Sequence, residues 1–248
     1  MNDRPDGQRL VILPSYNSGA QLRKTVEAVR TVWSPVWVVV DGSTDGSDRG
    51  LEDGHGLRVL RLSRNGGKGA AILHAFDEAQ RCGYDHALVM DADGQHPVER
   101  VRPFMEASRE NPGWLIAGVP VFGPDAPVER VKGRLVGNTL ATIETLGRGA
   151  RDSLFGFRVY PIRPSLSILQ STRGARRFDF DTVLAVRLAW LGVPTCNLEA
   201  PVVYPDHGEG GVTHFRYVRD NLLLARVHVG LFFGMFLRIP RLLRLPCR

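Results

Sequence analysis

Asp91 and Asp93 are the side chains of this sequence whose spacing most directly suggests chemistry. They follow the short apolar run 87–90 and precede Gly94, a pattern typical of a buried strand that ends in a tight turn. Carboxylates two residues apart at a strand end lie on the same face, and burying them costs free energy unless a cation or strong donors compensate. Mg²⁺ and Mn²⁺ prefer oxygen ligands of this kind. The motif is therefore either a metal site or a polar loop after a strand.

The elements that must position these carboxylates alternate between strand and helix patterns. Short apolar runs predict strands at 10–13, 36–40, 58–60, 87–90 and 115–117. Apolar residues at helical spacing predict helices at 20–32, at 69–79 and from about Pro97. Continuous apolar strands separated by helices indicate an α/β fold, with a mostly parallel central sheet and helices on both faces. Ligands of such sheets bind at the carboxyl ends of the strands, where the polar segments 14–17, 41–45 and 91–95 should meet.

The second half of the chain has a less regular pattern. Its predicted elements are a helix at 131–146, a loop and strand over 152–160, an amphipathic helix at 180–190, a strand at 193–198 and mostly helix from Phe215. The segment 201–211 is rich in glycine, proline and acidic residues, which is typical of a loop. No internal repeat or linker interrupts this order.

Composition limits the classes of function. The 248 residues, 43% hydrophobic and 23% charged, suffice for one domain or at most two. The three scattered cysteines, Cys82, Cys196 and Cys247, argue against a zinc site or a disulfide framework and fit a reducing compartment. The net charge of +6 is mostly arginine, which suits phosphate or carboxylate ligands, and no motif points to nucleic acid. The N-terminus shows no apolar secretory segment, so we expect a cytoplasmic protein.

Four short motifs occur in a fixed order, at 14–17, 41–45, 65–70 and 91–97. This series resembles the family 2 glycosyltransferases with the GT-A fold, especially the dolichyl- and polyprenyl-phosphate sugar synthases. The resemblance is close over about the first half and continues more loosely to about Arg216. It implies an inverting, metal-dependent enzyme of hexosyltransferase type. It also implies a catalytic domain at 1–214, with a nucleotide-sugar-binding half at 1–100 and an acceptor half at 101–214, followed by a helical extension at 215–248.

The same resemblance implies a donor site for a UDP- or GDP-type sugar nucleotide. The corresponding positions are Pro14, Tyr16, Asn17, Asp41, Lys68, Asp91, Ala92 and Asp93. An aromatic ring gives a base a stacking surface, and a carboxylate accepts from base N–H or ribose hydroxyl groups. Lys68 would lie near the diphosphate at a helix start. The alternatives are that Tyr16 and Asp41 stabilise turns and that Lys68 is a solvated side chain.

A metal and a general base are implied as well. Asp91, Asp93 and Gln95 correspond to ligands of Mg²⁺ or Mn²⁺, which would offset charge on the departing diphosphate. Many family 2 enzymes carry an acidic residue in the second half that takes the proton of an acceptor hydroxyl. Asp181 matches that position, Asp179 is the second candidate, and a helix N-cap is the alternative role.

The acceptor side departs from the family pattern. Segment 152–158 resembles a family motif, but Phe155 stands where a small hydroxyl residue is usual, and no arginine-aromatic pair follows the strand at 115–117. Six further residues are candidates for acceptor or loop contacts, with a solvated or structural role as the alternative: Arg130, Arg134, Asn138, Arg158, His214 and Arg216. The stretch 204–221 looks like bacterial members associated with lipid or aryl-polyene assembly.

The C-terminal segment combines apolar and basic residues. Residues 227–237 are nearly all apolar but fall short of the ~20 residues that a spanning helix needs. Arginines then alternate with leucines up to Arg248, which suits a helix lying on an anionic membrane. With a lipid acceptor we expect peripheral binding at the inner face of the cytoplasmic membrane; the alternative is a helix packed on the domain or in a dimer contact.

Two other functions compete with a glycosyltransferase. A nucleotidyltransferase usually has a glycine- and arginine-rich loop after its first strand, whereas Ser15 to Ser18 follow it here. A catalytically silent nucleotide-sugar sensor at the membrane would bind donor without turning it over. Neither alternative needs Asp181, so replacement of that residue distinguishes them from the enzyme.

Overall fold

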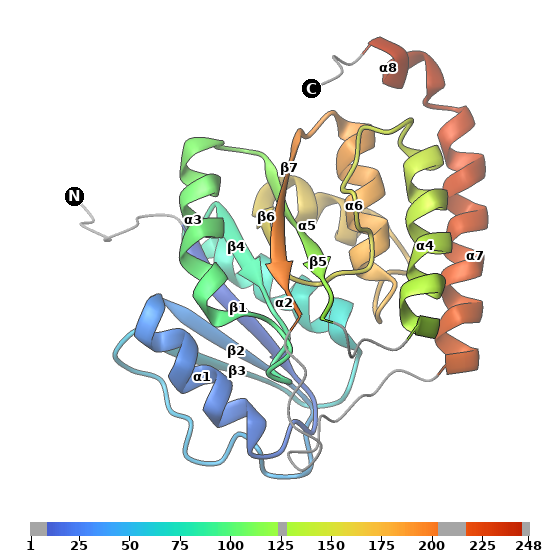
Figure 1. Ribbon diagram of the computed structural model, residues 1–248. Helices are drawn as coiled ribbons and strands as arrows, with labels where there is room; N and C mark the ends of the chain where they lie inside the picture. Colours follow the sequence, from blue (N-terminus) through green and yellow to red (C-terminus); the bar gives the residue numbers. More distant parts are fainter. Residues whose placement is uncertain (1–8, 124–127, 203–216, 245–248) are drawn as a thin grey trace.

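A seven-stranded sheet forms the centre of the protein, with strand order β3-β2-β1-β4-β6-β5-β7 (Figure 1). The computed structural model describes residues 9–123, 128–202 and 217–244. The strands are β1 (Arg9–Ser15), β2 (Val36–Asp41), β3 (Leu57–Leu62), β4 (His86–Val89), β5 (Leu115–Val121), β6 (Arg158–Pro161) and β7 (Thr195–Pro201). All neighbours pair in parallel except β6, which runs antiparallel to both β4 and β5. The predicted mostly parallel sheet is confirmed.

Helices cover both faces of this sheet, as the sequence predicted. Helices α1 (Gln21–Val32) and α3 (Val101–Glu110), the latter preceded by the short turn η1 (Val98–Arg100), pack on one face. Helices α2 (Lys68–Arg81), α5 (Ile162–Ser171) and α6 (Phe180–Leu191) pack on the other. Successive side chains of a strand point to opposite faces, so Val38 enters the first core while Trp37 and Val39 enter the second. This two-sided burial explains why β2 is apolar without alternation.

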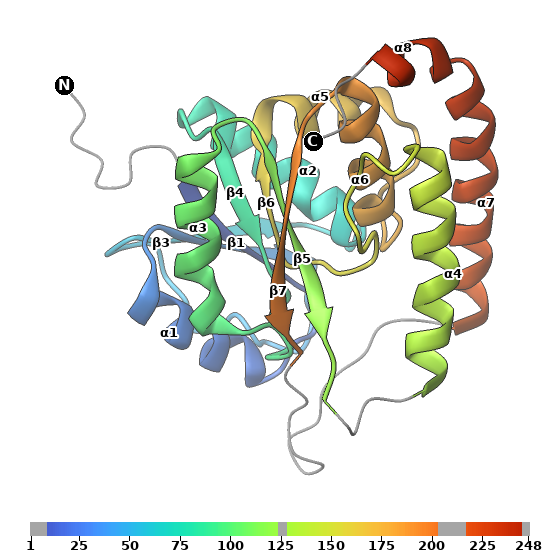
Figure 2. The same cartoon turned by 45° about the horizontal axis from the view of Figure 1, so that its top comes forward.

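Two further helices form an outer layer over α6. Helices α4 (Val128–Glu144) and α7 (Tyr217–Phe236) lie side by side in both views of the fold, and α8 (Ile239–Arg244) follows α7 (Figures 1 and 2). Their apolar contacts with α6 form a third cluster, which includes Ala141, Trp190 and Leu231. The buried Glu144 carboxylate, 2.9 Å from Nδ1 of His228, also joins α4 to α7. The C-terminal helices are therefore attached to the body of the protein by packing as well as by a polar contact.

The structure corrects one prediction and adds an element. Helix α6 was predicted to be amphipathic, but ten of its twelve residues are buried. The reason is that α6 lies between the sheet on one side and α4 and α7 on the other, so it has almost no solvent face. Helix α5 was not predicted. No helix in the described part of the chain is both long enough and apolar enough to span a membrane.

Candidate functional site

A cavity of about 400 Å³ lies at the carboxyl ends of β1, β2 and β4. It forms there because three neighbouring parallel strands end at the same edge of the sheet and their polar loops meet. Most of the predicted donor-binding residues line it: Pro14, Tyr16, Asp41, Lys68, Asp91, Ala92 and Asp93. The sequence-based expectation that three separate loops converge is thus confirmed by the geometry.

Asp41 fixes the loop that leads into α2. Its two carboxylate oxygens accept the main-chain N–H groups of Gly66 and Gly67, each at 2.8 Å. Gly67 has a φ of +95°, and a Cβ there would lie 2.5 Å from the main-chain oxygen of Arg176. Only glycine combines this φ with such a close approach. Asp41 therefore lines the cavity and also holds the first turn of α2 in place, although α2 begins one residue later at Lys68.

Lys68 bridges two carboxylates from distant parts of the chain. Its Nζ lies 2.5 Å from Oδ1 of Asp91 and 3.5 Å from Oδ2 of Asp181. Burial disfavours the ammonium charge, but the carboxylates of Asp181 and Asp91 outweigh burial and raise the pKa of Lys68 above its usual value. Lys68 is therefore charged, and much of its charge is already neutralised inside the protein.

The two acids of the 91–93 motif differ in their electrostatic environment. Burial raises the pKa of Asp91, yet the charge of Lys68 more than compensates and holds that pKa below its usual value. The pKa of Asp93 is raised, first by burial and then by the neighbouring Asp91 charge. A divalent cation beside both carboxylates would remove the repulsion that disfavours ionised Asp93.

His96 supports this motif as a neutral ring. The main-chain N–H of Asp91 donates to Nδ1 of His96 at 2.8 Å, so the ring hydrogen is on Nε2. That Nε2 lies 3.9 Å from Oδ2 of Asp91. Burial lowers the pKa of His96, despite the opposing charges of Asp91 and Asp93. His96 was not among the predicted site residues; it is buried against Phe155, with the two ring centroids 4.9 Å apart.

The carboxylates fit a metal whose remaining ligands come from substrate. Among the residues that the structure describes, no three His, Cys, Asp or Glu side chains are grouped as a metal site. Asp91 and Asp93 nevertheless both line the cavity, and Mg²⁺ commonly binds one or two carboxylates together with phosphate oxygens. Gln95 is not among the lining residues, and its main-chain N–H donates to Oδ1 of Asp93 at 3.0 Å. The predicted pair fits the metal better than the predicted third ligand does.

Asp181 lies below the cavity, within a buried polar network. The Tyr160 hydroxyl donates to its Oδ1 at 2.8 Å, and the Arg158 guanidinium donates to its main-chain oxygen, also at 2.8 Å. Only 4% of Asp181 is exposed, and it is not among the lining residues. Gly156 covers the network, because a Cβ there would be 2.7 Å from Nζ of Lys68. Asp181 is thus connected to the cavity by its contact with Lys68, which does line it.

Asp179 has a different environment from Asp181. Its Oδ2 accepts the N–H of Ala175 and its Oδ1 accepts the N–H of Arg177, each at 2.9 Å. It stands at the N-cap position of α6 without capping the helix through its side chain. Both oxygens therefore stabilise the loop before α6, which carries two residues of the cavity wall. The assignment of a base to Asp181 or Asp179 stays a prediction.

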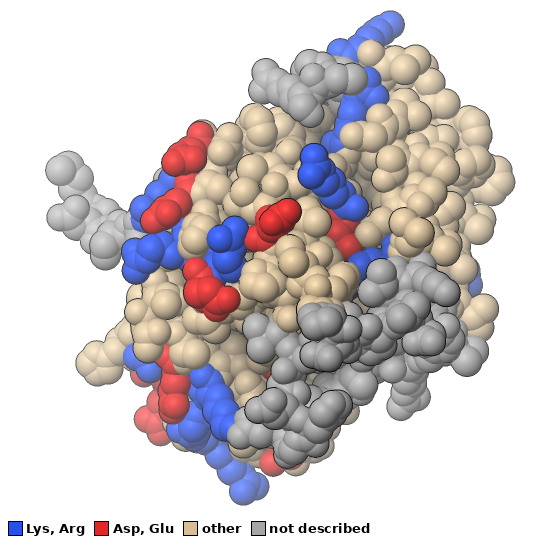
Figure 3. Space-filling model, viewed as in Figure 1, with Lys and Arg blue, Asp and Glu red and all other residues tan. Residues whose placement is uncertain are grey.

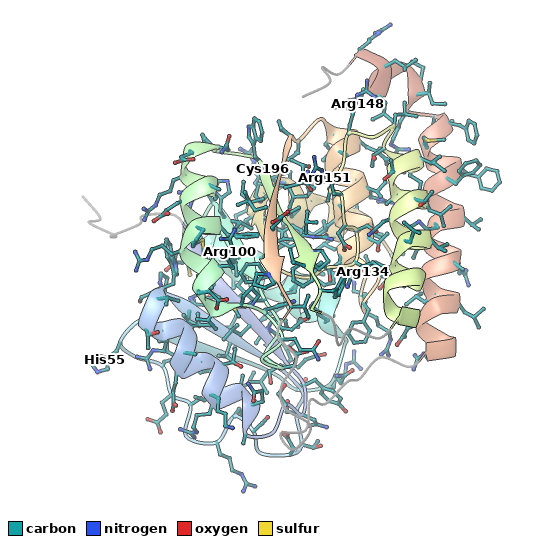
Figure 4. All side chains as sticks on the ribbon, in the orientation of Figure 1. His55, Arg100, Arg134, Arg148, Arg151 and Cys196 are labelled. Atoms are coloured by element: carbon teal, nitrogen blue, oxygen red, sulfur yellow. The ribbon has the colours of Figure 1, made fainter. Side chains whose placement is uncertain are left out.

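Several of the acceptor-side candidates stabilise one loop. Arg134, which points from α4 toward the middle of the molecule (Figure 4), forms an ion pair of 2.7 Å with Asp152. Asn138 donates to the same carboxylate at 2.8 Å, and the fully buried Arg158 donates to the Asp152 main-chain oxygen at 2.9 Å. These contacts fix the segment that leads to Gly156 rather than line the cavity.

The other candidates are placed as follows. Oδ1 of Asn17 accepts the N–H of Thr44 at 2.8 Å, so Asn17 holds the loop after β2 beside the cavity. The Arg130 side chain, His214 and Arg216 lie outside the described residues.

Four residues from the second half of the chain line the cavity without having been predicted as site residues. They are Arg177, Phe178, Arg219 and Asp220. The first two precede α6, and the last two lie in the first turn of α7. No spacing pattern connects them with the donor motifs, because they reach the cavity only when the second half of the chain folds back over the carboxyl ends of β1 and β4. The arginines add positive charge to a cavity whose lysine is already paired.

Comparison with known proteins agrees with this geometry. The family model described as Glycosyl transferase family 2 matches residues 10–166. The polyprenol monophosphomannose synthase of Mycolicibacterium smegmatis is 32% identical over 167 residues, which span 63% of this chain and 63% of that protein. The undecaprenyl-phosphate mannosyltransferase of Micrococcus luteus is 28% identical over 217 residues, or 81% of this chain and 85% of the relative.

Solved structures share the fold. Glucosyl-3-phosphoglycerate synthase from Mycobacterium tuberculosis, crystallised with Mn²⁺, UDP and glucosyl-3-phosphoglycerate, aligns over 92% of this chain and 79% of its own with a TM-score of 0.63 and 17% identity. TarS from S. aureus, in complex with UDP-GlcNAc, aligns over 90% of this chain and 66% of its own, with a TM-score of 0.54 and 16% identity. The fold is therefore the GT-A fold, with the cavity at its sheet edge.

Proposed function

This chain belongs to glycosyltransferase family 2, and we propose that it transfers a sugar from a nucleotide diphosphate sugar to the phosphate of a polyprenyl lipid, with inversion. The observation that carries the proposal is the meeting of Tyr16, Asp41, Lys68 and the pair Asp91 and Asp93 in one cavity. The named relatives from M. smegmatis and M. luteus act on polyprenol and undecaprenyl phosphates, which supports a lipid phosphate as acceptor.

The donor would lie across the ends of β1, β2 and β4. Tyr16 offers a ring face to the base, and Asp41, already bound to Gly66 and Gly67, presents its remaining lone pairs to base or ribose donors. Arg177 and Arg219 would meet the diphosphate, because the charge of Lys68 is largely offset by Asp91 and Asp181. The nucleotide and the sugar are left open between UDP and GDP types.

Asp91 and Asp93 would hold Mg²⁺ or Mn²⁺, which supplies a positive charge beside the departing diphosphate. The protein's own contribution is to keep both carboxylates at the cavity wall. The main-chain N–H of Gln95 donates to the Asp93 carboxylate, and the Lys68 ammonium pairs with the Asp91 carboxylate, so neither acid can turn away freely. Fixed charges of this kind act without reorganising when the bond to the sugar breaks.

The role of Asp181 depends on the acceptor. A lipid hydroxyl must lose a proton, and Asp181, or Asp179 in second place, would accept it. A phosphate monoester is already ionised near neutral pH, so with that acceptor Asp181 mainly holds Lys68 against Asp91. The network of Asp181, Tyr160 and Arg158 is suited to this positioning because all three side chains are buried.

The decisive experiment offers the purified protein labelled UDP- and GDP-sugars with a short-chain prenyl phosphate and Mn²⁺. Formation of a prenyl phosphosugar by one donor, lost in Asp93→Ala, supports the proposal. Thermal stabilisation by a sugar nucleotide without any product indicates the silent sensor instead. Release of pyrophosphate from a nucleoside triphosphate and a sugar phosphate indicates a nucleotidyltransferase.

A further inference from the structure

We propose that the outer surface of α4, α7 and α8 docks on a membrane rich in anionic lipid headgroups. This surface, directed away from α6, is called the outer helical face here. Docking on a membrane would bring the protein to the lipid acceptor proposed above, and its biological role depends on that proposed function. Ten of the twelve large apolar side chains exposed in the described part of the chain belong to it: Leu135, Val136, Ile143, Leu222, Val229, Phe232, Phe233, Phe236, Leu237 and Leu243.

Helix α7 provides the centre of the face. Leu222, Val229, Phe233 and Phe236 follow one another at spacings of seven, four and three residues, so they form one stripe along the helix. They are 66%, 58%, 67% and 50% exposed. The opposite side of the helix packs into the protein through residues such as Leu231. At the rise of an α-helix the stripe is about 21 Å long. It therefore forms a continuous apolar patch rather than a set of single exposed side chains.

The charges around this stripe have one sign. Residues 221–248 contain five arginines and no aspartate or glutamate. Arg226, Arg238, Arg241 and Arg244 are all exposed, although Arg238 also stacks on Trp190 of α6 and Arg241 donates to the main-chain oxygen of Leu191. In Figure 3 the surface over α7 and α8 is accordingly tan and blue. Arginines among exposed phenylalanines and leucines are the composition of helices that lie in the headgroup region of anionic bilayers.

Residues 133–143 of helix α4 extend the face without adding an acid. Residues 133–143 carry a single charged side chain, Arg134, which turns inward to Asp152. Glu144 is buried and paired with His228. Leu135 and Val136, 67% and 62% exposed, thus continue the apolar surface of α7. The two neighbouring helices present one broad surface.

A second copy of the chain is a poorer occupant than a membrane. The stripe has coiled-coil-like spacing, but pairing two copies would bring arginines of the same sign together, with no exposed acid among residues 133–144 and 222–244 to offset them. On a membrane, anionic headgroups offset the charges of the arginines, and the apolar side chains enter the boundary between the headgroups and the acyl chains. No helix in the described residues can span a bilayer, so the face would lie on its surface.

The position of the face suits a lipid acceptor. Arg219 and Asp220, in the first turn of α7, line the cavity, and Leu222 begins the stripe two residues later. In Figures 1 and 2 the stripe-bearing helix runs from this cavity end along the side of the molecule. A protein lying on this face would therefore keep one end of its membrane contact next to the reaction site.

The test measures binding of the full chain to vesicles of phosphatidylglycerol and phosphatidylcholine by co-sedimentation. Phe233→Glu combined with Leu237→Glu should weaken binding by roughly tenfold or more, because it places charge in the apolar contact. Arg226→Ala with Arg244→Ala should weaken binding to the anionic vesicles roughly 30-fold, since each basic residue near such a surface contributes about a fivefold change.

The matched control is Arg30→Ala with Arg102→Ala, on α1 and α3. It lowers the net charge by the same two units on another side of the sheet, and should keep near-wild-type binding. If the control variant loses vesicle binding to the same extent, the overall charge of the protein explains the effect and the proposal is wrong. A wild-type dimer, seen by light scattering, that the Phe233→Glu and Leu237→Glu variant dissociates while vesicle binding is unchanged would also overturn the proposal.

The outcome stays separate from that of the proposed function. Vesicle binding needs no donor, metal or turnover, whereas transfer to a short-chain prenyl phosphate in detergent-free buffer needs no membrane. Transfer without vesicle binding therefore refutes only the docking face. Vesicle binding without transfer to any prenyl phosphate refutes only the acceptor.

Discussion

The ammonium of Lys68 and the carboxylate of Asp91 form a direct ion pair, with Nζ 2.5 Å from Oδ1. The pair joins the start of α2 to the end of β4, and Asp181 adds a second carboxylate 3.5 Å from the same nitrogen. A proposed metal ligand is thus already compensated by a cation of the protein. Metal and lysine must share Asp91, so we expect the metal to bind weakly until a diphosphate contributes further oxygen ligands.

Replacing Lys68 by Met should therefore strengthen metal binding and weaken catalysis. Without the ammonium, Asp91 loses its ion pair and can pair with the incoming cation instead, so Mn²⁺ affinity of the nucleotide-free protein should rise roughly tenfold. Isothermal titration calorimetry measures this affinity, and Lys24→Met on the exposed side of α1 is the control. An unchanged Mn²⁺ affinity in Lys68→Met would mean that lysine and metal do not compete.

Removal of the Asp181 charge should reduce turnover severely. Asp181→Asn is expected to lower kcat about 100-fold, since it takes away either the base or the anchor of Lys68. Tyr160→Phe removes only the hydroxyl that donates to Asp181, and should lower kcat less than tenfold with little change in KM for the donor. Full activity of Asp181→Asn with a prenyl phosphate would exclude the anchoring role, and full activity with a lipid hydroxyl would exclude the role as base.

Arg177 and Arg219 should contribute to donor affinity. Each lines the cavity, and replacing either by alanine should raise the dissociation constant of the nucleoside diphosphate roughly tenfold, because charge-assisted bonds to phosphate are lost. Fluorescence or calorimetric titration measures the effect. Arg102→Ala, an exposed arginine of α3, should bind the nucleotide like the wild type; if all three variants weaken alike, general charge is responsible.

His86 should make folding stability depend on pH. Burial, aided by the charge of Arg9, lowers its pKa from 6.5 to about 4. The unfolded chain therefore takes up a proton near pH 6.5, whereas the folded protein resists it until near pH 4. Stability contributed by neutral His86 is complete above pH 6.5 and declines as the pH falls toward 4, by up to about 3 kcal/mol.

Urea unfolding at pH 7.5 and pH 4.5 measures this dependence. His86→Asn, which keeps an acceptor for the N–H of Gly113, should lose stability less steeply with acid than the wild type. His74→Asn changes an exposed histidine of α2 and should follow the wild type. If the His86 and His74 variants behave alike, the acid sensitivity arises from other groups.

Much of the fold could be predicted from short windows of the sequence, because a strand that is buried on both faces appears as a continuous run of apolar residues. The runs at Val36 to Val40 and at Ala87 to Met90 each become strands within a residue or two of the expected bounds. The meeting of three polar loops in one cavity could also be predicted, since parallel strands end at one edge and each loop has a recognisable motif.

Other features depend on packing that short windows of sequence do not contain. Helix α6 is apolar on every side because helices arriving before and after it cover its outer surface. Arg219 reaches the cavity because α7 packs on α6, and no spacing pattern around residue 219 relates it to the motifs of the first half. The burial of Asp181 beneath Gly156 likewise depends on β6 lying between β4 and β5.

The reversal of β6 decides which stretches of the second half can influence the reaction. At the edge of the sheet that carries the cavity, each parallel strand contributes the loop that follows it. Because β6 is antiparallel to β4, it contributes the loop that precedes it. Gly156 of that loop therefore lies beside Lys68 and Asp91. Insertions or substitutions just before Arg158 should therefore change acceptor specificity. Changes just after Pro161, at the opposite end of the same short strand, should affect only the stability of the fold.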